Sequence, residues 1–123
     1  DVYKTGVTEQ EAEAFANNDA ELMATALQKK LPHFNALNGV RQRVLIDMAF
    51  NMGERKLGQF VSMFDGLGKK DFNKAADNML YNFNKKGKKV GKTGYFKDVG
   101  KRATRLSKII RTGQDNRLFM GFK

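Results

Sequence analysis

The segment Asn38–Gly53, NGVRQRVLIDMAFNMG, constrains the fold most, because it carries a helix start, a helix end and few polar residues between them. Asn38 suits the N-cap position, since its side-chain oxygen can accept a hydrogen bond from an early helical amide that has no other partner. Gly53 can adopt the left-handed backbone that ends a helix. The segment therefore predicts one helix with defined ends.

Apolar residues cover nearly the whole circumference of this helix, so we expect other helices to enclose it. They are Val40, Val44, Leu45, Ile46, Met48, Ala49, Phe50 and Met52. The remaining sector holds Arg43, Asp47 and Asn51, spaced four residues apart. A polar stripe on a buried helix faces water, which reaches such a helix through a cleft. The stripe is therefore expected to border a cleft.

Length and composition restrict the class of protein. At 123 residues the chain has the size of one domain, which we place at residues 1–123, with a core that needs no covalent staples. The absence of cysteine excludes disulfides and thiolate zinc sites, and the single histidine, His33, excludes Ser-His-Asp, Cys-His and multi-histidine metal sites. We expect no metal and no cofactor. Any hydrolytic chemistry would have to use carboxylates.

The net charge of +10 is concentrated in residues 85–111, where eleven basic residues accompany one acid, Asp98. The basic residues are Lys85, Lys86, Lys88, Lys89, Lys92, Lys97, Lys101, Arg102, Arg105, Lys108 and Arg111. Two interpretations stay open: a solvated face that keeps the protein soluble, or a docking surface for a polyanion such as nucleic acid, acidic membrane or anionic cell wall. Nucleic acid is not expected, because only Tyr95 and Phe96 interleave the charges and no nucleic-acid motif is present.

The other segments also follow a helical period. A capping box at Thr8–Glu11 begins a long connecting helix over residues 8–29, whose second half buries a stripe of Leu22, Ala26 and Leu27. Further helical stripes lie in residues 60–67, 71–83 and 98–112, and residues 84–94 are expected to be a basic loop. No segment alternates convincingly with period two. The predicted fold is all-α: several short helices, with residues 38–113 as the core, around one buried central helix preceded by the connecting helix.

Residues 40–54, VRQRVLIDMAFNMGE, resemble the buried core helix of the T-even phage lysozymes, in which a VR..(A/V)LI.M.F.MGE pattern occurs. The match continues in the same order through Gly58-Gln59-Phe60, Ala75-Ala76-Asp77-Asn78, Arg102-Ala103 and Arg111-Thr112-Gly113. Upstream, Val7-Thr8 and Glu11-Ala12-Glu13 resemble the start of that family's inter-lobe helix. The resemblance covers about residues 6–113 and implies the C-terminal helical lobe of a two-lobed lysozyme.

The resemblance implies a muramidase that hydrolyses the β-1,4 bond between N-acetylmuramic acid and N-acetylglucosamine in peptidoglycan. In that family a glutamate acts as the acid, and an aspartate and a threonine position water on the other face of the sugar. All three residues lie in the N-terminal lobe, before the connecting helix. We therefore expect residues 1–7 to be a remnant of that lobe, and no catalytic residue to be present in this chain.

A replacement carboxyl pair within the chain is not expected. Asp47 and Glu54 are seven residues apart and share a helix face. However, Arg43 lies one turn before Asp47 and is expected to hold it ionised, whereas Glu54 follows a helix end and is expected to be solvated.

The resemblance does carry over to the wall of the cleft that contacts sugar. Phe50 matches a position that lines the cleft, Asn78 one that hydrogen-bonds saccharide, and Met63 one where the family often has a serine. With Asn51 from the polar stripe, and with Arg102, expected to meet a carboxylate of the N-terminal lobe or of the peptide stem, they form the candidate substrate-binding set. Phe50 and Met63 also fit a core stripe, and Asn78 also fits simple exposure.

The implied partners are bacterial peptidoglycan and the N-terminal lobe, with weak contact to anionic membrane, and the chain is expected to be a monomer. The resemblance implies a phage-encoded protein that acts on the host cell wall, between host cytoplasm and periplasm; no signal-peptide pattern is visible. A second hypothesis is a non-enzymatic cationic domain that binds anionic membrane or wall polymers. It depends on residues 85–111, whose helix places Val99, Leu106 and Ile110 on one side.

Overall fold

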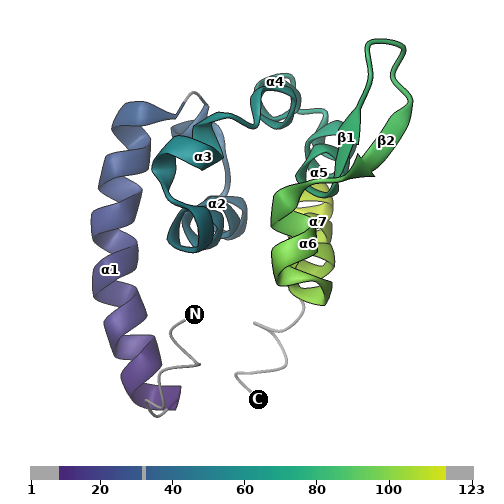
Figure 1. The fold of residues 1–123 in the computed structure, drawn as a ribbon. Coiled ribbons are helices and arrows are strands. Elements are labelled where there is room, and N and C mark those ends of the chain that lie inside the picture. The colour runs from purple at the N-terminus through teal and green to yellow at the C-terminus, as the bar shows by residue number, and fades with distance from the viewer. Residues whose placement is uncertain (1–8, 32, 116–123) are drawn as a thin grey trace.

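The computed structural model describes residues 9–31 and 33–115, and it is mostly helical (Figure 1). The predicted capping box at Thr8 and the predicted remnant at residues 1–7 lie outside the described residues, as do the side chains of residues 9–19. The elements in order are α1 (Glu9–Lys30), the 3-10 helix η2 (Phe34–Ala36), α2 (Gly39–Met52), α3 (Glu54–Gly58), α4 (Val61–Gly68), α5 (Phe72–Leu80), β1 (Tyr81–Phe83), β2 (Lys89–Lys92), α6 (Gly94–Val99) and α7 (Lys101–Thr112). The predicted all-α class is confirmed.

The long helix α1 stands at one side of the molecule, with its C-terminal end against η2 and α2 (Figure 1). Leu27 is fully buried there, as the stripe predicted. Leu22 is 73% exposed, so its predicted burial is wrong. Met23 and Ala24, the next two residues of the helix, are partly buried against the core, so Leu22 lies on the side of α1 that faces away from the body. Within the described residues, no helix is both long and apolar enough to span a bilayer.

The central helix α2 begins and ends where the sequence predicts. The Asn38 side chain accepts a hydrogen bond from the Arg41 amide at 3.1 Å, and Gly53 follows the helix with a φ of 88°. One face of α2 supplies Val44, Leu45, Met48 and Ala49 to the core. The opposite face is open, because Arg43 and Phe50 are exposed. The expectation that other helices enclose α2 on all sides is therefore wrong: one face is buried, and the apolar residue Phe50 lies on the exposed face.

The start of α2 is bound to the end of α7. The Arg41 guanidinium donates from Nε to the Ile110 carbonyl at 2.7 Å, and it lies 3.4 Å from the ring centroid of Phe72. The side-chain amide of Asn38 donates from Nδ2 to the Gly113 carbonyl at 3.1 Å. The last carbonyls of a helix have no intrahelical donor, and a cation there is favoured by the helix dipole. These contacts therefore complete the C-terminus of α7 and lock α2 against it.

The last predicted helix, residues 98–112, is confirmed as α7 from Lys101 to Thr112, whereas residues 98–99 belong to the separate short helix α6, which the sequence analysis did not predict. Thr93 caps α6 by accepting from the Phe96 amide at 3.1 Å, and Gly100, with a φ of 60°, separates α6 from α7. A φ in this range is accessible to glycine at no steric cost, so the chain can turn between two helices without a loop. Leu106 and Ile110 of α7 are buried in the core.

The predicted loop of residues 84–94 instead forms the tip and second strand of a β-hairpin. The predicted helix of residues 71–83 ends early, at Leu80, and its last three residues form the first strand. Strands β1 and β2 pair antiparallel, with Tyr81 opposite Lys92 and Phe83 opposite Lys89, and the hairpin stands away from the helical body (Figure 1). The three residues of β1 are too few to show a period-two pattern in the sequence. This hairpin is the whole sheet of the described residues, so the all-α class holds.

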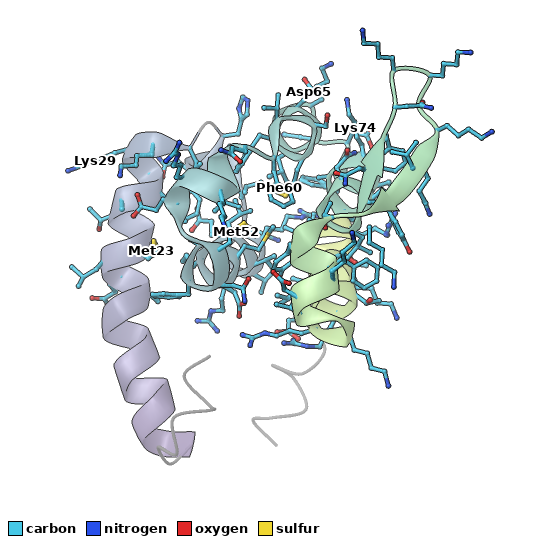
Figure 2. All side chains as sticks on the ribbon, viewed as in Figure 1. Met23, Lys29, Met52, Phe60, Asp65 and Lys74 are labelled. Carbon is cyan, nitrogen blue, oxygen red and sulfur yellow. The ribbon has the colours of Figure 1, made fainter. Side chains whose placement is uncertain are left out.

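Helices α4 and α5 pack closely because Gly66 has no side chain. A Cβ at Gly66 would lie 2.9 Å from the Ala75 nitrogen and from the Asp71 carbonyl oxygen. Asp65 of α4 also bonds Lys74 of α5 at 2.6 Å, and both residues are visible at the top of Figure 2. This contact sets the position of α5, the helix that precedes the hairpin.

Truncation of the buried face of α2 tests its place in the core. Leu45→Ala and Met48→Ala should each lower the free energy of unfolding by about 2–5 kcal/mol, because both side chains are fully buried and each change leaves a cavity. Asn51→Ala, on the exposed end of the same helix, should change it by less than about 0.5 kcal/mol. Urea denaturation measures all three. A Leu45→Ala protein as stable as the parent would contradict the core position.

Candidate functional site

The junction of α2 and α7 holds an ion pair between Asp47 and Arg102. Both side chains are mostly buried, with 26% of Asp47 and 34% of Arg102 exposed. The sequence analysis expected Arg43, one turn away, to hold Asp47 ionised, but the ion-pair partner in the structure is Arg102. Arg102 thus has a carboxylate partner within the chain, and the expected contact with a carboxylate of the N-terminal lobe or of the peptide stem stays a prediction. Two helices brought together by the fold provide the Asp47–Arg102 contact, and helical spacing alone does not reveal it.

Glu54 is also ion-paired. It begins α3, and its carboxylate accepts from the Lys30 ammonium at 2.6 Å, with 27% of the Glu54 side chain exposed. The expectation that Glu54 is solvated is therefore wrong. Asp47 and Glu54 are each engaged by a cation from another helix. They do not form a pair of free carboxyls facing one another, which acid–base cleavage of a glycosidic bond requires.

The last turn of α2 presents Phe50 and Asn51 to solvent. Phe50 is 49% exposed, and Asn51 is also exposed. Asn51 lies four residues after Asp47, on the same side of the helix as the ion pair. Figure 2 shows Met52 and Phe60 between α2–α3 and the α6–α7 pair, where both are half-buried. The end of α2 therefore exposes an aromatic ring and a side-chain amide next to the packed apolar side chains of Met52 and Phe60.

Asn78 lies in the last turn of α5 and is half-buried. Its amide nitrogen donates to the Lys74 carbonyl at 2.8 Å, which fixes the side chain and leaves its carbonyl oxygen as the group that can accept from a ligand. The α5 helix is tied to α7 by Arg111, which donates to Asp77 at 2.8 Å. Asn78 thus belongs to a rigid part of the body.

Met63 does not reach the surface. Its side chain is fully buried in the core between its neighbours on α4 and the other helices. A side chain with no exposed area cannot contact a sugar in this conformation, so the core interpretation holds and we remove Met63 from the candidate set. The helical pattern of α4 by itself allows Met63 to lie either in the core or at the surface of the cleft.

A tyrosine that the sequence analysis did not select lies at the same junction. Tyr95 of α6 is 5% exposed, and its hydroxyl has no hydrogen-bond partner among the described residues. Burial raises the pKa of Tyr95 above its usual range, and the Asp47 carboxylate raises it further, while Arg102 and Arg105 act in the opposite direction. These interactions place the Tyr95 hydroxyl in the same electrostatic environment as the Asp47–Arg102 pair.

The structure thus brings Asp47, Arg102 and Tyr95 together where α2, α6 and α7 meet. Asn51 lies one turn after Asp47, Phe50 is on the open face of α2, and Asn78 lies on another helix, α5. Another feature lies elsewhere: a shallow depression lined by His33, Gly58, Val61, Phe64 and Asp65, which contains none of the candidate residues. In residues 9–31 and 33–115, no group of three or more histidine, aspartate or glutamate side chains is arranged to hold a metal ion.

The model of the phage lysozyme family matches residues 1–112. The chain therefore belongs to the phage lysozyme family. Membership assigns it to the lysozyme-type muramidases, whose substrate is bacterial peptidoglycan. The helical fold and the open aromatic and amide surface agree with that class.

A double-mutant cycle tests the Asp47–Arg102 pair. Asp47→Ala and Arg102→Ala should show a coupling free energy of about 1 kcal/mol, because the pair is only partly screened by solvent. The matched control is the cycle of Asp47→Ala with Arg43→Ala, whose coupling should be smaller, at most about 0.5 kcal/mol, because the two residues are only neighbours on one helix face. Urea denaturation of the variants gives both values. Coupling to Arg43 in place of Arg102 would contradict the structure.

The Tyr95 hydroxyl gives a second prediction. Tyr95→Phe removes a buried polar group that has no partner, so the free energy of unfolding should stay unchanged or rise by up to about 1 kcal/mol. Tyr95→Ala, which removes the ring as well, should lower it by about 3 kcal/mol or more. Thermal unfolding followed by circular dichroism compares the two. A Tyr95→Phe protein destabilised by more than about 1 kcal/mol would show that the hydroxyl has a partner.

Proposed function

We propose that this chain forms one wall of the sugar-binding cleft of a muramidase, with Phe50, Asn51 and Asn78 as its contacts to the glycan. The reaction of that muramidase is hydrolysis of the β-1,4 bond between N-acetylmuramic acid and N-acetylglucosamine, at the host cell wall. The observation that carries the proposal is Phe50, which is 49% exposed on the helix that also holds the centre of the core.

An exposed phenylalanine on a rigid helix suits a sugar ring. The C–H face of a pyranose packs on an aromatic ring, and its hydroxyls need paired donors and acceptors. Asn51 supplies an exposed amide one residue away, and Asn78 supplies a fixed amide whose oxygen is available. Because α2 is anchored in the core, these groups need little ordering when a glycan binds.

We further propose that this chain contributes binding and not proton transfer. Its two carboxylates nearest the end of α2 are each paired with a cation, Asp47 with Arg102 and Glu54 with Lys30. Cleavage requires one protonated and one ionised carboxyl on opposite sides of the bond. Residues outside this chain would then supply the acid and the water-positioning groups.

The alternative, a cationic domain that enters membranes through its last helix, has less support. Such a helix must turn its apolar side toward lipid. In α7 that side is already used, because Leu106 and Ile110 are buried in the core. The positive charge of α7 remains, but its apolar side is not available to contact lipid.

Incubation with purified peptidoglycan tests the proposal, with sedimentation of the protein and release of reducing ends measured together. We expect co-sedimentation without new reducing ends. Phe50→Ala and Asn78→Ala should each weaken binding by about tenfold, equivalent to ~1.4 kcal/mol. Val61→Ala, which also trims an exposed apolar side chain but lies away from the site, should bind as the parent does.

Two outcomes would contradict this account. Reducing ends above those of a heat-inactivated sample would show that the chain catalyses, and Asp47 and Glu54 would then be the residues to replace. Equal loss of binding in Phe50→Ala and Val61→Ala would show that the open face of α2 is not the glycan contact.

A further inference from the structure

The hairpin formed by β1 and β2 carries positive charge that no carboxylate of the described residues neutralises. Residues 81–93 contain five lysines, Lys85, Lys86, Lys88, Lys89 and Lys92, and no acidic residue. All five lysines are exposed. No ion pair involves any of them in the described part of the chain, whereas Lys30, Lys74, Arg102 and Arg111 are each paired with a carboxylate elsewhere in the molecule.

The tip of this hairpin is a turn held together by hydrogen bonds to Asn84. The Asn84 side-chain oxygen accepts from the amides of Lys86 and Lys88, both at 2.9 Å, and the Gly87 amide donates to the Asn84 carbonyl at 2.9 Å. Gly87 has a φ of 79°, which glycine adopts without strain. The backbone that carries the tip lysines is therefore ordered before any ligand binds.

The base of the hairpin is equally fixed. The buried Thr93 hydroxyl donates to the Met79 carbonyl at 2.7 Å, and the Thr93 amide donates to the Leu80 carbonyl at 2.8 Å. Above the base, the Lys89 ammonium lies 3.8 Å from the ring centroid of Tyr81, and the Lys92 ammonium lies 4.8 Å from that of Phe96. Cation–π contacts of this kind hold ammonium groups in place. The hairpin thus has a fixed backbone and two fixed ammonium groups, Lys89 and Lys92, and it projects from the body (Figure 1).

We propose that the hairpin is a docking site for a linear phosphate polymer of the cell envelope, of the polyol-phosphate type. Five ammoniums within residues 81–93, with no acidic residue among them, concentrate positive charge on one hairpin, and this charge complements a polymer that carries a phosphate in every repeat. Assigning the polymer to the envelope depends on the proposed function, because a muramidase works there.

The side chains of the hairpin argue against two other polyanions. Bases of single-stranded nucleic acid stack on exposed aromatic rings, but the Tyr81 and Phe96 rings are half-buried and covered by Lys89 and Lys92. A lipid bilayer is bound through charge and inserted apolar groups together. Val90, 61% exposed, is the hairpin's only exposed large apolar side chain among the described residues. A polymer without bases or acyl chains needs only the charge.

Binding of a fluorescent poly(glycerol phosphate) chain, measured by anisotropy over a range of salt concentrations, tests the proposal. Because binding releases counterions, the logarithm of affinity should fall with the logarithm of salt concentration with a slope of about −0.7 per neutralised phosphate, or roughly −3.5 for five lysines. The tip variant Lys85→Gln, Lys86→Gln, Lys88→Gln keeps the turn, which uses only backbone amides of these residues. It should bind at least tenfold more weakly, with a slope smaller by about 2.

The matched control removes three exposed charges on the other side of the molecule: Lys29→Gln, Arg55→Gln, Lys56→Gln, on α1 and α3 (Figures 1 and 2). It has the same net charge as the tip variant and should bind within about twofold of the parent. Equal loss in the two variants would overturn the proposal, because net charge alone would then explain binding. Tighter binding to single-stranded DNA or to phosphatidylglycerol vesicles than to the polymer would overturn it as well.

The two proposals fail separately. Phe50→Ala should leave polymer binding unchanged, whereas the tip variant should leave binding of an uncharged N-acetylglucosamine oligomer unchanged. If the parent protein binds the polymer but not the oligomer, only the proposed sugar site is contradicted. If it binds the oligomer but not the polymer, only the hairpin proposal is contradicted.

Discussion

The contact between Arg41 and the end of α7 is the interaction on which the rest of the arrangement depends. The guanidinium bonds the Ile110 carbonyl and lies against the Phe72 ring, so one side chain joins α2, α5 and α7. Burial lowers the pKa of Arg41 without neutralising it, because an arginine keeps its charge in proteins. The cation therefore completes helical carbonyls that would otherwise be buried without donors.

An ion pair fixes the same two helices at a second point. Asp47 lies later in α2 and binds Arg102, early in α7, whereas Arg41 lies early in α2 and binds late in α7. The two helices are therefore antiparallel and held at two separated points. With its buried face held in this way, α2 keeps its opposite face toward solvent. Phe50 stays exposed on a rigid helix for this reason, and the proposed glycan contact depends on that exposure.

The cationic character of the chain divides into two parts with different physical roles. On α7, the basic residues surround an apolar face that belongs to the core, so they solvate the helix or bind acids such as Asp77. On the hairpin, the lysines have no acidic partner among the described residues and stand on an ordered backbone. The charge is one continuous stretch in sequence, but folding separates a structural part from a part that is free to bind.

The sequence by itself determined the helical class and both ends of α2, because caps such as Asn38 and glycines such as Gly53 act within a few residues. It also indicated the phage lysozyme family through residues spread along the chain. It did not reveal α3, α6 or the hairpin. Only the tertiary structure decided that Met63 is core, that Asp47 pairs with Arg102, and which part of the charge is unpaired. Helical periodicity allows a stripe to face either core or solvent, and ion pairs between distant helices depend on packing that no local pattern encodes.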